Sequence, residues 1–88
     1  MYKVLWAPSA RRQLANSIPP NVGAAIWAFV TQVLAEQPHR VGKPLHNELA
    51  GRWVARRGEY RVIYRIDDET RTISIVALGH RRGIYHRR

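Results

Sequence analysis

The sequence contains no cysteine, so disulfide bonds and thiolate chemistry are excluded. Its four histidines are scattered and form no recognisable zinc-binding pattern, so we expect neither a metal nor another cofactor. The sequence also has no apolar run long enough for a signal peptide or a membrane span. These absences predict a cytoplasmic protein with no membrane partner.

Acidic residues are scarce as well. Six Asp and Glu stand against 15 Lys and Arg, which gives a net charge of +9 and a pI near 11.3. Such a surface attracts nucleic acid, acidic proteins or anionic membranes. Most of the basic residues are arginines, which bind phosphate in a bidentate manner better than lysines do. A chain of 88 residues is expected to form one domain, residues 1–88.

The order of the predicted elements is strand, two helices, hairpin and strand. Residues 2–6 alternate as a strand does, and Pro8 suits the first turn of a helix that follows. A second helix is expected from Asn21 to about Gln37, where Pro38 stops it. Its predicted apolar stripe comprises Val22, Ile26, Phe29, Val30 and Val33, widened by Trp27 and Leu34. Residues 39–51 are interpreted as a long connection, and residues 72–78 as the last strand.

Residues 52–65 (RWVARRGEYRVIYR) predict a β-hairpin that turns near Arg57-Gly58. A two-residue turn there would set Val54 opposite Arg61 and Arg56 opposite Glu59. Because side chains alternate along a strand, one face is predicted to be core. The core face would comprise Trp53, Ala55, Tyr60, Val62, Tyr64 and Ile66. The opposite face would carry Arg52, Arg56, Arg61 and Arg65 around Val54 and Ile63.

The last strand extends this pattern, with Ile73, Ile75 and Ala77 expected on the core face and Val76, Leu78 and His80 on the arginine face. The apolar residues left on the arginine face would then be covered by a partner or by the C-terminal segment GIYHRR. His80 would lie near Arg61, and its ordinary pKa near 6.5 suits proton transfer. The other titratable candidates are Glu59, Tyr85 and His86. Tyr85 either stacks on an RNA base or anchors the tail to the sheet.

Three segments together resemble the RelE/ParE superfamily of bacterial toxins from type II toxin–antitoxin operons, and the RelE branch most closely. They are VGKPLHNELAGRW, RRGEYRVIYRID and GHRRGIYHR. The resemblance implies an α+β fold in which two N-terminal helices pack on one face of a small, mostly antiparallel four-stranded sheet. It implies an endoribonuclease that cleaves mRNA in the ribosomal A site by metal-independent attack of the 2′-OH. It also implies a cognate antitoxin, through which alone the toxin would reach operator DNA.

The resemblance also assigns roles by position. Arg61 corresponds to the arginine that stabilises the scissile phosphate, Arg81 to the one that assists the leaving group, and Tyr85 to the tyrosine that orients the mRNA. Arg52 and Val54 stand where the family has two active-site lysines, so the usual general base is missing. Some relatives place a histidine near the end of the last strand, which would make His80 the acid or base here.

The remaining residues expected to bind RNA are Arg56, Lys43 and Arg82. Two other functions stay open at this point. One is a ParE-like inhibitor of DNA gyrase that cleaves nothing, which the valine at position 54 favours. The other is an inactive toxin-fold module that only binds an antitoxin.

Overall fold

The computed structural model describes residues 1–80. In this part of the chain, helices occupy three stretches before the hairpin: α1 (Pro8–Asn16), α2 (Pro20–Ala28) with its π-helical continuation η1 (Phe29–Leu34), and α3 (Pro38–Val41). The strands are β1 (Lys3–Trp6), β2 (Lys43–Pro44), β3 (Trp53–Arg57), β4 (Tyr60–Asp67) and β5 (Thr72–His80). A 3-10 turn, η2 (Asn47–Leu49), lies in the loop between β2 and β3.

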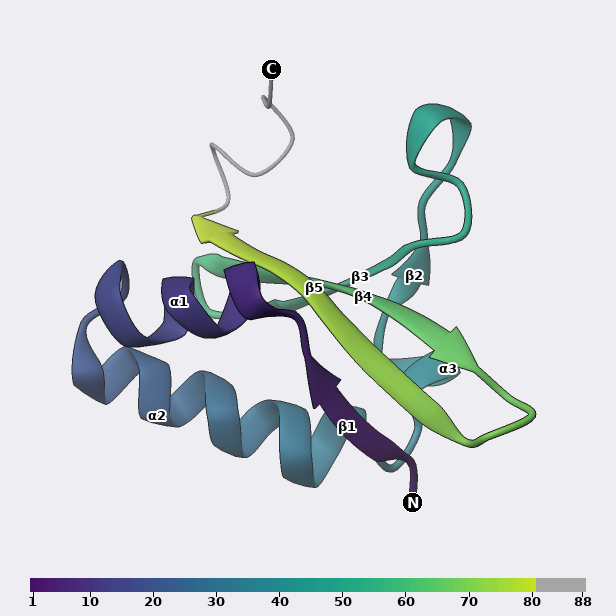
Figure 1. The fold of residues 1–88 in the computed structure, drawn as a ribbon, viewed down its shortest axis with the longest axis horizontal. Coiled ribbons are helices and arrows are strands. Elements are labelled where there is room, and N and C mark those ends of the chain that lie inside the picture. Colours follow the sequence, from purple (N-terminus) through teal and green to yellow (C-terminus); the bar gives the residue numbers. More distant parts are fainter. Residues whose placement is uncertain (81–88) are drawn as a thin grey trace.

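The strands form one sheet in the order β1-β5-β4-β3-β2. Only the β1–β5 pair is parallel within the described residues, and the other three pairs are antiparallel. Helices α1 and α2 lie beside each other against one face of the sheet (Figure 1). The expected α+β architecture is therefore confirmed, with one addition. Residues 43–44 of the predicted connection pair with β3 and make a fifth strand.

The second helix ends in a π-helical stretch, and this changes which residues face the core. The Ala35 N–H donates to the carbonyl oxygen of Val30 at 3.0 Å, a bond that spans five residues. In this wider turn the residue four positions after Val30 stays on the buried side. Leu34 is therefore fully buried, whereas Val33 is 47% exposed, contrary to the predicted stripe. Trp27 is also half exposed and stacks on Trp6 with ring centroids 5.1 Å apart.

The hairpin turns one residue later than predicted. Gly58, with φ of 63°, and Glu59 form the turn, so Arg57 pairs with Tyr60 and Arg56 pairs directly with Arg61. Glycine occupies the first of the two turn positions because a positive φ is required there. Moving the turn by one residue shifts the residue paired with each position of β3 by two positions along β4. Since the side-chain period is also two, both predicted faces of the hairpin survive.

β5 contains a bulge that the sequence pattern did not predict. Ile75 pairs with Tyr64, Ala77 pairs with Ile63, and Val76 between them is the extra residue. A bulge reverses the alternation for the residues beyond it. Leu78 therefore lies opposite Val62 on the core face, where it is 1% exposed, and the prediction that it lies on the arginine face is wrong.

Helix α3 and Gly42, the residue that follows it, are attached to the sheet through Tyr64. The Tyr64 hydroxyl donates to the carbonyl oxygen of Pro38 at 2.6 Å, and the backbone of Gly42 bonds the same hydroxyl group. Tyr64 is fully buried, and this burial raises the pKa of its hydroxyl well above the usual value. Its ring also stacks on Trp53, with centroids 6.4 Å apart. The start of the long connection is thus anchored at Pro38 and Gly42, while His39, Arg40 and Val41 between them are exposed.

The bulge makes a prediction about stability. We expect Leu78→Ala to lower the free energy of unfolding by about 2–5 kcal/mol, because it opens a cavity in the core. Val54→Ala, on the opposite face, should cost about 1 kcal/mol or less. Urea denaturation of both variants measures the difference. Equal losses would contradict the reversal of faces beyond Val76.

Two glycines provide a second, matched comparison. A Cβ at Gly42 would collide with the Tyr64 hydroxyl and lie 2.7 Å from the Val54 carbonyl oxygen, whereas a Cβ at Gly23 would meet its nearest neighbour at 3.5 Å. Gly42→Ala should therefore cost about 2–3 kcal/mol. Gly23→Ala, inside α2, should raise stability by up to about 1 kcal/mol. Thermal unfolding of the two variants measures both changes in stability. An alanine at position 42 that leaves stability unchanged would refute the tight contact at Gly42.

Candidate nucleic-acid interface

The face of the sheet away from α1 and α2, which we call the arginine face, carries those basic residues expected to bind RNA that lie within residues 1–80. Arg56 and Arg61 lie directly opposite each other, and Arg65 lies on the same side of β4 four residues after Arg61. Arg52, just before β3, continues the same alternation. Two like charges facing each other are unfavourable by themselves. The arrangement suits an anion shared by both guanidinium groups.

The next row of this face is apolar except at one end. Pairing places Lys43, Val54, Ile63 and Ala77 side by side across β2, β3, β4 and β5. Lys43 is thereby brought to the arginine face by the short strand that the sequence pattern did not reveal. Ile63 is only 5% exposed although it lies outside the main core cluster. The predicted apolar cluster on this face is confirmed in part, with Ala77 in the place expected for Leu78.

His80 lies on the other face of the sheet. It pairs with Tyr60, and its ring approaches the Tyr60 ring edge-on at 5.6 Å. Its Nε2 atom is 3.0 Å from Oε1 of Glu59 at the hairpin tip. Gly79, not His80, lies opposite Arg61. The prediction that His80 lies near Arg61 is wrong, because the bulge at Val76 reverses the end of β5.

The arginine face offers charge but little acid–base chemistry within residues 1–80. Between the Arg56–Arg61 pair and Arg65, the strands of this face carry no histidine and no carboxylate among residues 1–80. No group of three or more potential metal-binding side chains occurs among the same residues. Three predicted site residues, Arg81, Arg82 and Tyr85, lie outside the described residues, as does the candidate His86.

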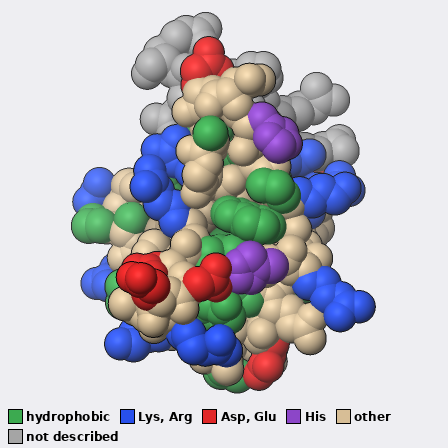
Figure 2. All heavy atoms as spheres, turned by 90° about the vertical axis from the view of Figure 1, so that its right-hand side faces the viewer, with side chains coloured by type: hydrophobic (Ala, Val, Ile, Leu, Met, Phe, Trp, Pro, Cys, Tyr) green, Lys and Arg blue, Asp and Glu red, His purple; other side chains and the backbone are tan. Residues whose placement is uncertain are grey.

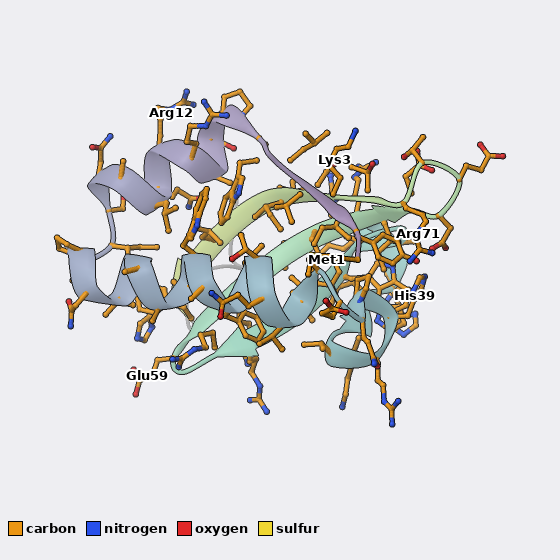
Figure 3. All side chains as sticks on the ribbon, turned by 90° about the horizontal axis from the view of Figure 1, so that it is seen from below. Met1, Lys3, Arg12, His39, Glu59 and Arg71 are labelled. Carbon is orange, nitrogen blue, oxygen red and sulfur yellow. The ribbon has the colours of Figure 1, made fainter. Side chains whose placement is uncertain are left out.

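A second group of titratable side chains lies at the far end of the sheet. The Tyr2 hydroxyl donates to Oδ1 of Asp68 at 2.6 Å, and Nε2 of His39 is 3.1 Å from Oδ2 of the same carboxylate. The guanidinium of Arg71 covers the Tyr2 ring at 4.6 Å. Figure 3 shows His39 and Arg71 at one end of the molecule and Glu59 at the other. Sequence reasoning missed this group because its members are far apart in the chain.

The hydrogen bonds of this group shift the pKa values of Tyr2 and Asp68 and join separate segments of the chain. The hydrogen bond from Tyr2, followed by that from His39, lowers the pKa of Asp68, and the same Tyr2–Asp68 bond raises the pKa of Tyr2. At this end of the molecule, acidic side chains gather near a histidine with basic side chains around them (Figure 2). The group joins the residue just before β1, helix α3 and the β4–β5 turn, so it holds three separate segments together.

Comparisons with known proteins agree on one family. Residues 4–85 match the model of the ParE toxin of the type II toxin–antitoxin system parDE. The toxin RelG of Mycobacterium tuberculosis is 49% identical over 86 residues, 98% of each chain. The toxin RelE of the same organism is 42% identical over 84 residues, 96% of this chain and 86% of that one.

Solved structures show the same fold. A chain of the toxin–antitoxin complex RelBE2 from Mycobacterium tuberculosis superimposes with a TM-score of 0.86 and 49% identity, covering 91% of this chain and 98% of that chain. The isolated RelE toxin of E. coli gives a TM-score of 0.74 at 14% identity, covering 91% and 84%. Among residues 1–80, none of the helices has the length and apolar character needed to cross a membrane.

The Tyr2–Asp68 bond predicts a pH dependence of stability. Since the folded-state pKa of Asp68 is lowered, its contribution is present above the ordinary value of 3.8 and is lost as pH falls through the lower folded value. Since the pKa of Tyr2 is raised, its contribution is present below 10.0 and is lost as pH rises further. Tyr2→Phe should therefore melt at a lower temperature than the unmodified chain at intermediate pH. The gap should close toward both extremes.

Melting curves recorded at several pH values measure this gap. Glu69→Gln is the matched control, since it removes a carboxylate from the same turn without touching the Tyr2–Asp68 bond. A gap that is independent of pH would show that the two groups are not coupled.

Proposed function

Because the chain belongs to the ParE toxin family of type II toxin–antitoxin systems, we propose that it is a ribosome-dependent endoribonuclease that cleaves mRNA in the A site. The observation that supports this proposal most is the pairing of Arg56 with Arg61 across β3 and β4. Two guanidinium groups on neighbouring strands suit a phosphodiester whose negative charge grows during reaction. The protein would act in the cytoplasm.

The proposed reaction needs no metal. The 2′-oxygen of the mRNA forms a bond to the adjacent phosphorus, and the bond from phosphorus to the 5′-oxygen breaks. The 2′-OH gives up its proton and the departing 5′-oxygen receives one, leaving a 2′,3′-cyclic phosphate and a 5′-OH. Arg61 and Arg56 stabilise the charge on the phosphorane between these steps.

The other assigned residues bind and orient the RNA. Lys43 and Arg52 extend the positive face along the backbone of the mRNA, and Arg82 adds a further phosphate contact. By family position, Arg81 assists the leaving group and Tyr85 stacks on a base. The family's usual base is replaced by Val54, and His80 bonds Glu59 on the other face. We therefore assign proton transfer to the C-terminal segment, where Tyr85 and His86 are the titratable groups.

A cognate antitoxin is the proposed protein partner. The similar mycobacterial chain was solved as part of a toxin–antitoxin complex. The net charge of +9 favours an acidic segment lying over the arginine face. Contact with operator DNA would come only through that antitoxin, and no membrane partner is proposed.

One observation favours a second candidate, an inhibitor of DNA gyrase that cleaves nothing. Val54 stands in the place of the family's usual base, between Lys43 and Ile63, and its side chain can neither accept nor donate a proton. A face built in this way holds an anionic or acidic surface without supplying a proton acceptor.

The proposal predicts the effect of Arg61→Ala. We expect it to abolish growth arrest and to lower the rate of mRNA cleavage on ribosomes by about 10²–10³-fold, the loss typical of one group that stabilises a transition-state charge. Arg12→Ala, which removes an exposed arginine from α1, is the matched control and should stay toxic. Mapping of mRNA 5′-ends inside translated frames measures both.

Other outcomes select other functions. Full toxicity of Arg61→Ala would overturn the assignment. Intact mRNA together with inhibited DNA supercoiling would select the gyrase inhibitor. Harmless expression without antitoxin would leave a module that only binds its partner.

A further inference from the structure

β5 extends beyond the strand that flanks it. β1 ends at Trp6, opposite Ile75, and the last backbone bond between the two segments runs from the Ala7 N–H to the Ile75 carbonyl oxygen at 2.9 Å. From there Pro8 begins α1, while β5 continues to His80. The end of β5 therefore has β4 on one side and a helix, not a strand, on the other.

A single side chain of that helix takes the place of the absent strand. Oε1 of Gln13 accepts from the Leu78 N–H at 2.9 Å, and Nε2 of Gln13 donates to the Leu78 carbonyl oxygen at 2.6 Å. The carboxamide thus makes the pair of bonds that a directly opposite residue of an antiparallel strand would make. Both partners are largely shielded, since Gln13 is half buried and Leu78 is 1% exposed.

The contact follows from the helical spacing of α1. Ser9 and Gln13 are four residues apart, so they lie on one face of the helix. The Ser9 hydroxyl reaches the carbonyl oxygen of Val76, the bulge residue, at 3.4 Å. Helix α1 therefore contacts the backbone of β5 at the bulge and again two residues later. Without the bulge, the backbone groups of Leu78 would point toward β4 rather than toward Gln13.

We propose that Gln13 is a positioning residue for the arginine face. By holding Leu78, it fixes Gly79 opposite Arg61 and fixes the end of β5 at His80. Gln13 touches no RNA; it acts through the backbone of β5. The expected effect of Gln13 on the rate of mRNA cleavage rests on the proposed nuclease function. The two hydrogen bonds that hold Leu78, which we call the clamp, are independent of that function.

Two substitutions test it. Gln13→Met keeps the length of the side chain and removes both hydrogen bonds. Gln13→Glu keeps the acceptor, loses the donor and, when ionised, sets a carboxylate oxygen against the Leu78 carbonyl. A protonated carboxyl has both a donor and an acceptor, so it can restore the pair. Gln32→Met, an exposed glutamine in η1, is the matched control.

Hydrogen exchange at the Leu78 amide measures directly whether the two hydrogen bonds from Gln13 protect Leu78. We expect protection to fall about tenfold or more in Gln13→Met, and to stay unchanged in Gln32→Met. In Gln13→Glu, protection relative to the unmodified chain should recover as pH falls through the titration of the introduced carboxyl group. Unchanged protection in both Gln13 variants would overturn the clamp.

The rate of single-turnover cleavage at saturating ribosome concentration tests the positioning role of Gln13. Gln13→Met should cleave about 10–100-fold more slowly per folded molecule, because small misplacements of catalytic groups are costly, while its ribosome affinity stays within about twofold. Cleavage at the unmodified rate would overturn positioning. If the unmodified chain does not cleave mRNA at all, the proposed function and the positioning role fall together, and the exchange data still decide whether Gln13 clamps Leu78.

Discussion

The ladder between β4 and β5 carries one residue more on β5 than on β4, and the architecture of the site depends on that extra residue. Val76 has no partner between Ile75 and Ala77, so every side chain beyond it changes face. Leu78 enters the core, and His80 moves beside Tyr60 and away from Arg61. The backbone of Leu78 turns toward α1, where Gln13 bonds it.

This arrangement separates the arginine face from both histidine–carboxylate pairs. The two histidine–carboxylate pairs, His39–Asp68 and His80–Glu59, lie at opposite ends of the molecule, and neither belongs to the arginine face. The arginine face of residues 1–80 can therefore hold a polyanion and stabilise charge, but neither histidine is placed to transfer a proton there. For this reason the proposed nuclease depends on the C-terminal segment as much as on the sheet.

Much of the fold could be predicted from local patterns. The first helix begins at Pro8, where proline suits a first turn, and the second begins one residue before the expected Asn21. The hairpin turns one residue later than expected, with Gly58 supplying the positive φ. The π-helical end of α2 and the short strand at Lys43 could not be predicted in the same way. Each is stabilised by contacts with distant segments rather than by its own composition.

The amino-acid sequence alone determined the two faces of the hairpin, with arginines opposite aromatic and aliphatic residues, because alternation along a strand is a local property that a shifted turn preserves. Only the tertiary structure decided the faces at the end of β5 and the neighbours of His80. A bulge depends on how β1, α1 and β4 pack around one strand at the same time. That packing joins residues more than sixty positions apart, as the bonds between Gln13 and Leu78 show.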